Sequence, residues 1–117
     1  MNVPQWETML REITGISGVR CALIVSADDG LVVAEAAMEG FETTDVAAFT
    51  ASIISRMQRT AGAMHIAPPN RMHLTAEAGT LLAVAGSDPL WLVAVADPTA
   101  EQGRLRLLLG DLAGVLA

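Results

Sequence analysis

The sequence predicts an α/β chain of the α+β type, with the order helix, two strands, helix, three strands, helix. Two observations support this prediction. Apolar residues recur at helical spacing around residues 4–14, 45–64 and 99–116, and five short β-rich runs lie between these segments. The links within each group of strands are short enough only for hairpins, which makes neighbouring strands antiparallel. With 117 residues, the chain has room for a single domain, residues 1–117.

The N-terminal helix and the first hairpin have clear local signals. Trp6, Met9, Leu10 and Ile13 lie at i, i+3, i+4 and i+7, so they share one face of a helix over residues 4–14. Strands are expected at residues 19–26 and 31–36, because Gly30 between them can adopt the positive φ of a tight turn. Both faces of the strand at residues 19–26 are apolar, so we expect helices to cover it on both sides.

A long helix is expected over residues 45–64, with Thr43 or Thr44 as its N-cap. Its apolar stripe consists of Val46, Phe49, Ile53, Met57 and Met64, with Ile54 and Ala61 flanking it. The other side carries small or polar residues, namely Ala48, Ser52, Ser55, Arg56 and Arg59. Such a side would let another helix approach closely.

The C-terminal half is expected to form a meander of three antiparallel strands, at residues 71–76, 80–85 and 90–96, followed by a helix. In the first of these strands Arg71, His73 and Thr75 alternate with apolar residues, which is typical of an edge strand with one exposed face. The third strand is apolar throughout, so we expect it at the centre of the sheet. The last helix has leucines at helical spacing, Leu105, Leu108, Leu109, Leu112 and Leu116.

Composition restricts the possible functions. Hydrophobic residues make up 52% of the chain, charged residues 17%, and the net charge is −6, so neither disorder nor general nucleic-acid binding is expected. The apolar stretches are shorter than the roughly 18 residues of a bilayer span, and residues 1–7 lack the features of a secretory signal. The single cysteine, Cys21, suits a reducing compartment. We therefore expect a cytoplasmic protein.

No catalytic, cofactor or metal site is predicted. The sequence contains no G-x-x-x-x-G-K-[ST], G-x-G-x-x-G, H-E-x-x-H or G-x-S-x-G motif. His65 and His73 are poorly spaced for a shared metal. Cys21 lies between apolar neighbours, so we expect a buried and unreactive thiol. The expectation is a chain that is not an enzyme and needs no cofactor.

The apolar content instead favours contacts with other proteins, because a small monomer with so few charges cannot cover itself. An open edge strand and a small-residue helix face both need covering. We expect a dimer interface formed by Ala48, Ser52, Ser55, Arg56, Arg59, Arg71, His73 and Thr75. For each of the arginines, an ordinary solvated position is the alternative to contact with an acidic partner.

The order of elements and three short segments resemble the Roadblock/dynein light chain superfamily, in particular its prokaryotic regulators of Ras-like GTPases. The segments are Gly18-Val19 before the first strand, residues 26–34 (SADDGLVVA) across the hairpin, and residues 99–106 (TAEQGRLR) opening the last helix. The resemblance covers nearly the whole chain. It implies a three-layer α-β-α sandwich, in which a five-stranded antiparallel sheet has the long helix on one face and the two terminal helices on the other.

The resemblance also implies a role. It implies a dimer, either with itself or with a paralogous Roadblock subunit, in which the second helices pack together and the following strands pair edge to edge. Prokaryotic members scaffold or regulate Ras-like small GTPases, some as GTPase-activating proteins, and they contribute no catalytic triad. For an activator of this kind we favour repositioning of the GTPase's own groups over insertion of an arginine. The expected function is a non-enzymatic adaptor of a GTPase.

The alternative is a small-ligand-sensing or signalling scaffold domain without a GTPase partner. Sandwiches of a sheet and helices also bind small molecules. This alternative predicts a pocket between sheet and helix, near Trp91.

Overall fold

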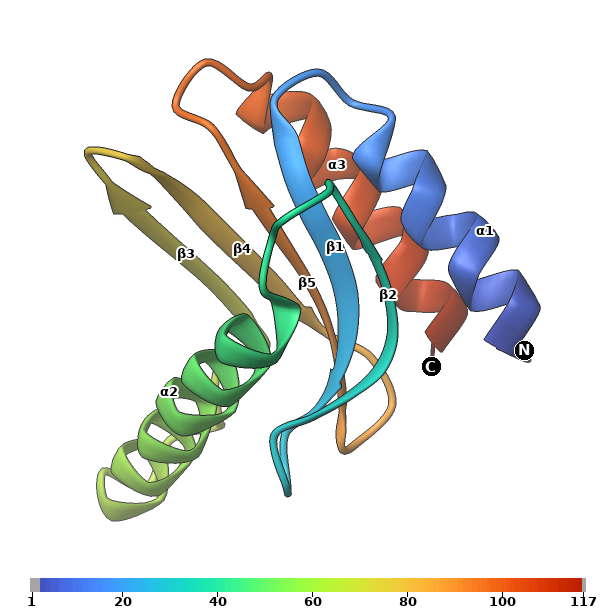
Figure 1. The fold of residues 1–117 in the computed structure, drawn as a ribbon. Coiled ribbons are helices and arrows are strands. Elements are labelled where there is room, and N and C mark those ends of the chain that lie inside the picture. Colours follow the sequence, from blue (N-terminus) through green and yellow to red (C-terminus); the bar gives the residue numbers. More distant parts are fainter. Residues whose placement is uncertain (1–2, 117) are drawn as a thin grey trace.

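The computed structural model describes residues 3–116, with side chains from residue 5 on. Met1 and Asn2, which form part of the segment expected not to be a signal, lie outside the described residues. The described chain forms three layers, with one sheet between two layers of helices (Figure 1). The elements are α1 (Val3–Thr14), β1 (Val19–Ser26), β2 (Leu31–Ala37), α2 (Thr43–Ala63), β3 (Arg71–Ala76), β4 (Gly79–Ala85), β5 (Leu90–Ala96), α3 (Gln102–Ala113) and the 3₁₀ turn η1 (Gly114–Leu116).

All five strands are antiparallel, in the order β2-β1-β5-β4-β3. The predicted class, order of elements and central position of β5 are thus confirmed, as is the edge position of β3. Gly30 has a φ of 72° in the first hairpin, as expected. β4 begins at Gly79, one residue earlier than predicted, so the β3–β4 turn consists of only Glu77 and Ala78.

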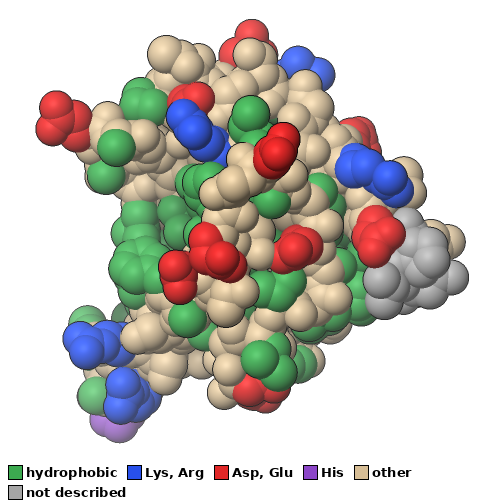
Figure 2. All heavy atoms as spheres, viewed as in Figure 1, with side chains coloured by type: hydrophobic (Ala, Val, Ile, Leu, Met, Phe, Trp, Pro, Cys, Tyr) green, Lys and Arg blue, Asp and Glu red, His purple; other side chains and the backbone are tan. Residues whose placement is uncertain are grey.

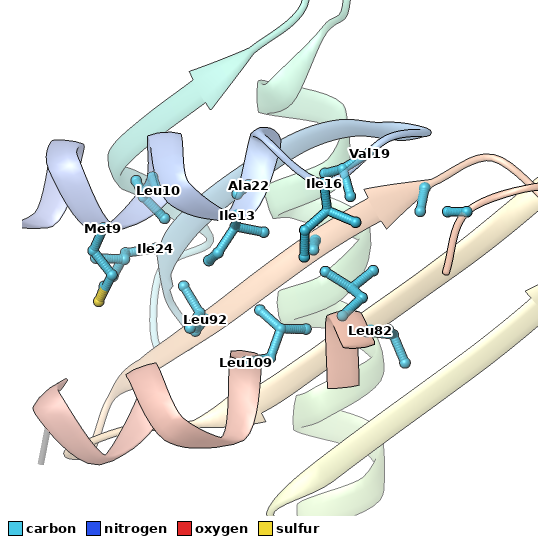
Figure 3. Close-up of a cluster of buried hydrophobic side chains, with 14 of the residues drawn as sticks. Met9, Leu10, Ile13, Ile16, Val19, Ala22, Ile24, Leu82, Leu92 and Leu109 are labelled. Atoms are coloured by element: carbon cyan, nitrogen blue, oxygen red, sulfur yellow. The ribbon is translucent and has the colours of Figure 1, made fainter. Parts of the chain in front are cut away.

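Helices α1 and α3 lie side by side on one face of the sheet, and α2 lies on the other (Figure 1). Leu10 and Ile13 of α1 and Leu109 of α3 meet Ile24 and Leu92 of the sheet in one buried cluster (Figure 3). On the other face, α2 packs on the alternate residues of the same strands, Cys21, Leu23, Val25, Trp91 and Val93. Since successive residues of a strand point to opposite faces, each strand contributes to both clusters. No helix within residues 3–116 is long and apolar enough to cross a bilayer.

The start of α2 differs from the prediction. The helix begins at Thr43 and its N-cap is Glu42, whose carboxylate accepts a hydrogen bond from the Thr44 backbone N–H at 3.3 Å. The Thr43 hydroxyl instead donates to the Glu35 carboxylate of β2. This bond ties the first turn of α2 to the sheet, and a bond between distant segments cannot be read from a local capping signal.

At its other end, α2 stops where His65 adopts a left-handed φ of 58°. The Ile66 N–H then donates to the Ala61 carbonyl at 3.0 Å, the bond that closes a Schellman motif. This ending leaves Met64 and Ile66 exposed. The following prolines separate the helix from β3.

Two polar groups lie in the core under α2. Thr50 is fully buried, and its hydroxyl has no hydrogen-bond partner among the described residues. Cys21 of β1 is also fully buried. Burial, the main cause, raises the pKa of its thiol from 9.0 to about 11. The thiol is therefore protonated at neutral pH, in agreement with the expectation of an unreactive cysteine.

Replacement of Thr50 by valine, which has the same shape, should stabilise the protein. An unsatisfied buried hydroxyl costs about 1–3 kcal/mol, so we expect the free energy of unfolding in urea to rise by about 1 kcal/mol in Thr50→Val. Thr44→Val, on the exposed side of the same helix, is the control and should change it by less than about 0.5 kcal/mol. A loss of stability in Thr50→Val would show that the hydroxyl is satisfied.

Stability should fall above about pH 9 because of Cys21. The thiol ionises near pH 9 in the unfolded chain but near pH 11 in the folded one, so the folded state binds more protons in this window and stability declines as pH rises. The sequence contains no lysine or tyrosine, so no other side chain should titrate there. Urea unfolding at several values between about pH 8 and about pH 11 should show the decline in the native chain and not in Cys21→Ala. Equal slopes in both would contradict the assignment.

Candidate protein-interaction surface

The side of α2 that faces the sheet is made mostly of small residues. The buried residues of the helix are Thr43, Ala47, Thr50, Ala51, Ile54 and Ala61. Ile54 is the one large apolar side chain among them, and the others allow the helix to lie close to the strands. Ile54 and Ala61, predicted to flank the apolar stripe, thus belong to the centre of the buried side.

The predicted stripe is not the buried side. Its members, here called the apolar flank, are Val46, Phe49, Ile53, Met57 and Met64. Val46, Ile53 and Met57 are half-buried at the border of the core, whereas Phe49 is 52% exposed and Met64 is 61% exposed. The signal in the sequence is that apolar residues occupy more than half of the helix circumference. Such a helix has more apolar surface than one sheet contact buries, and the excess is typical of a second contact.

The apolar flank borders a hollow of about 540 Å³. Phe49 and Val46 line it from the N-terminal half of α2, and Leu74 of β3 and Leu81 of β4 line it from the sheet. Figure 2 shows hydrophobic side chains exposed there, on the left of the molecule between α2 and the β3–β4 hairpin. The hollow exists because α2 packs mainly over β1 and β2 and leaves the sheet beside β3 uncovered.

A second hollow, of about 490 Å³, lies at the other end of the same flank. It is lined by Ile53, Met57, Met64 and Ile66. Arg56 borders it, and basic side chains gather in the same part of the molecule, at the lower left of Figure 2. The apolar flank is therefore open along its length, with arginine at its C-terminal end.

The predicted interface residues fall into two groups. Ala48, Ser52, Ser55, Arg56 and Arg59 are all exposed on α2. Arg71, His73 and Thr75 are exposed on β3, but they alternate with Met72 and Leu74, which pack on the α2 side of the sheet. The three therefore point to the opposite face, where the Arg71 guanidinium lies beside Gly110 of α3. The structure does not bring the two groups together into one patch.

The free edge of β3 lies between these two faces of the sheet. Its hydrogen-bonding partner on one side is β4, and its other side faces no strand of the described chain. An unpaired strand edge is a ready site for pairing with another chain. The apolar flank and this edge together form the candidate interaction surface.

Most arginines on these surfaces have no acidic neighbour. Arg20 donates to the Asp97 carboxylate at 2.5 Å, beside the larger hollow, and Arg104 lies 3.9 Å from Glu101. Within residues 5–116, no carboxylate lies within ion-pair distance of Arg56, Arg59 or Arg71. These side chains are free to contact a partner.

Among the described residues, no three His, Cys, Asp or Glu side chains are grouped as metal ligands. Trp91 is buried under α2 and does not line the larger hollow. The expectation of a pocket near Trp91 was therefore wrong about its place. The hollow is lined instead by Val95 and Ala96 at the other end of β5 and by residues of β3 and β4.

Neither a protein-family model nor a curated protein sequence matches this chain. Solved structures with a similar fold do exist. One, described as MglB with tetrameric arrangement, has a TM-score of 0.86 and 24% identity, over 98% of this chain and 87% of that chain. The gliding protein MglB from Thermus thermophilus has a TM-score of 0.86 and 22% identity, over the same shares of both chains.

A Roadblock/LC7 domain from Streptomyces avermitilis is also similar, with a TM-score of 0.80 and 16% identity over 93% of this chain and 92% of that chain. In all three comparisons the match extends over nearly the full length. The resemblance stated from the sequence is thus confirmed for the fold. The chain has the Roadblock/LC7 fold.

Proposed function

We propose that this chain is a non-enzymatic, dimeric adaptor that regulates a Ras-like small GTPase. The observation that carries the proposal is the open apolar flank of α2 beside the unpaired edge of β3, in a chain with the Roadblock/LC7 fold. One fold can host many functions, so the proposal depends more on the open surface than on the fold. The GTPase as partner rests on the resemblance to the prokaryotic Roadblock regulators.

The dimer would form by a two-fold contact between copies, or between this chain and a paralogous subunit. The edges of two β3 strands would pair, and the apolar flanks of two α2 helices would fill the hollows that each leaves beside its own sheet. Phe49 and Leu74 would then be buried, as the exposed apolar residues of homodimers usually are. A structural neighbour described as MglB with tetrameric arrangement supports self-association on this fold.

The GTPase would contact the outward side of α2. Arg56 and Arg59 are exposed there, without acidic partners among residues 5–116. We favour a mechanism in which the adaptor repositions the GTPase's own catalytic groups, because these arginines lie on a rigid helix rather than on an extended loop. In this proposal the chain itself catalyses nothing. Its one thiol, Cys21, is buried and protonated and so supplies no nucleophile.

A small-ligand sensor is the second candidate, and the hollow of about 540 Å³ lined mainly by apolar residues favours it. The two candidates differ in what fills the hollow. A ligand that raises the melting temperature of the native protein but not of Leu81→Trp, with the dimer mass unchanged, would favour the sensor.

One prediction of this proposal concerns the dimer contact. In Phe49→Glu, a charge on the apolar flank should weaken dimerisation at least about tenfold, as for loss of a central apolar anchor, and light scattering should report a monomer at micromolar concentration. Ser55 lies about 120° around the helix from Phe49, so Ser55→Arg tests the small-residue face instead. If the dimer were lost in Ser55→Arg and kept in Phe49→Glu, the dimer contact would be on the small-residue face. A monomeric native protein would refute the dimer.

Another prediction concerns the GTPase. The protein should co-purify with a Ras-like GTPase from the same genome, loaded with GDP or a GTP analogue. Nucleotide-dependent binding with faster GTP hydrolysis would identify an activator, and binding without acceleration would identify a scaffold. If no GTPase binds in either state, the proposal fails.

The double variant Arg56→Ala/Arg59→Ala separates the two modes of activation. An inserted arginine is worth about 10³-fold or more in hydrolysis rate, so a loss of that size would contradict repositioning. A loss below about tenfold would agree with it.

A further inference from the structure

A third depression lies on the face of the sheet opposite α2, between the edge strand β3 and helix α3. Its volume is about 400 Å³, and it is lined by Arg71, Met72, His73, Gly103, Arg106 and Leu107. We call it the basic trough. The dimer proposed above would use the backbone edge of β3, whereas the trough is lined by side chains of β3 and α3.

The trough is open because α3 packs on β4 and β5 and stops short of β3. Gly103, Arg106, Leu107 and Gly110 lie at i, i+3, i+4 and i+7, so they share the side of α3 that faces β3. At Gly110 an added Cβ would lie 3.4 Å from a guanidinium nitrogen of Arg71. The missing side chain therefore lets Arg71 extend along the helix. Leu107 is 73% exposed at the rim.

The charge of the trough opposes that of the whole molecule. The chain has a net charge of −6, yet Arg71, Arg106 and His73 line one depression and no carboxylate lines it. Within residues 5–116, neither Arg71 nor Arg106 has an acidic group within ion-pair distance, whereas Arg20 and Arg104 do. Arg71 and Arg106 line the same depression, and like charges repel each other, so a carboxylate bound in the trough would reduce this repulsion.

We propose that the basic trough binds an acidic segment of a partner protein. A guanidinium group pairs with a carboxylate through two parallel hydrogen bonds, and the exposed Leu107 offers contact to an apolar side chain between the acidic ones. A nucleic acid fits less well, because the acidic remainder of the surface repels a phosphate backbone. The proposal needs neither the dimer nor the GTPase, because both walls of the trough belong to one chain.

The test uses the full chain and a fluorescein-labelled octapeptide, EELEELEE, with QQLQQLQQ as the uncharged control. Fluorescence anisotropy should show binding of the acidic peptide only, weakened as salt rises from about 50 mM to about 300 mM. Arg106→Glu should weaken binding at least about tenfold. Arg11→Glu is the control, because it makes the same charge change at an exposed position of α1. This helix packs against β2, at the other edge of the sheet. The control should weaken binding of the peptide less than about twofold.

Arg71→Gln is the second variant, and it should also lose binding while light scattering shows the native mass. Equal binding of both peptides, or equal losses in Arg106→Glu and Arg11→Glu, would overturn the proposal. Tighter binding of a single-stranded oligonucleotide than of the acidic peptide, lost in Arg106→Glu, would overturn it in favour of nucleic acid. Failure of the GTPase assay would leave each of these results unchanged.

Discussion

The structure depends on the pairing of β5 with β1 on one side and β4 on the other. β5 is apolar at every position and comes from the C-terminal half of the chain, yet it lies beside β1 from the N-terminal half, with Val93 opposite Leu23. A central strand that is apolar on both faces obliges helices to cover both. Helices α1 and α3 share one face of the sheet, and α2 alone covers the other. With three helices for two faces, one face is covered less completely than the other.

The open surface beside β3 is a consequence of that asymmetry. A single helix cannot span five strands, and the bond between Thr43 and Glu35 holds the start of α2 over β2. The small residues on its inner side let it sit close to the sheet, while the larger apolar side chains lie toward the uncovered strands. Exposed apolar surface of this kind, next to an unpaired edge, either finds a specific partner or promotes aggregation.

Strand β3 belongs to two surfaces of different character. Its alternation sends Leu74 to the apolar hollow beside α2 and Arg71 to the trough beside α3. Pairing of its edge with another strand would use backbone groups in the plane of the sheet and leave both rows of side chains available. The apolar hollow would bind a partner by apolar contact, and the trough would bind one by charge. The two contacts would then respond differently to salt.

Local patterns in the sequence were enough to predict the helices and strands: helical periodicity, the turn at Gly30, the alternation of β3 and the apolar run of β5 predicted the elements, the edge strand and the central strand correctly. The composition also indicated more apolar residues than one core buries. Three outcomes came from the folded structure alone: which side of α2 faces the sheet, that the Thr43 hydroxyl donates to Glu35, and that Arg71 lies beside α3 and not α2. These outcomes depend on contacts between segments far apart in the chain, and local periodicity carries no information about how far a helix extends across a sheet.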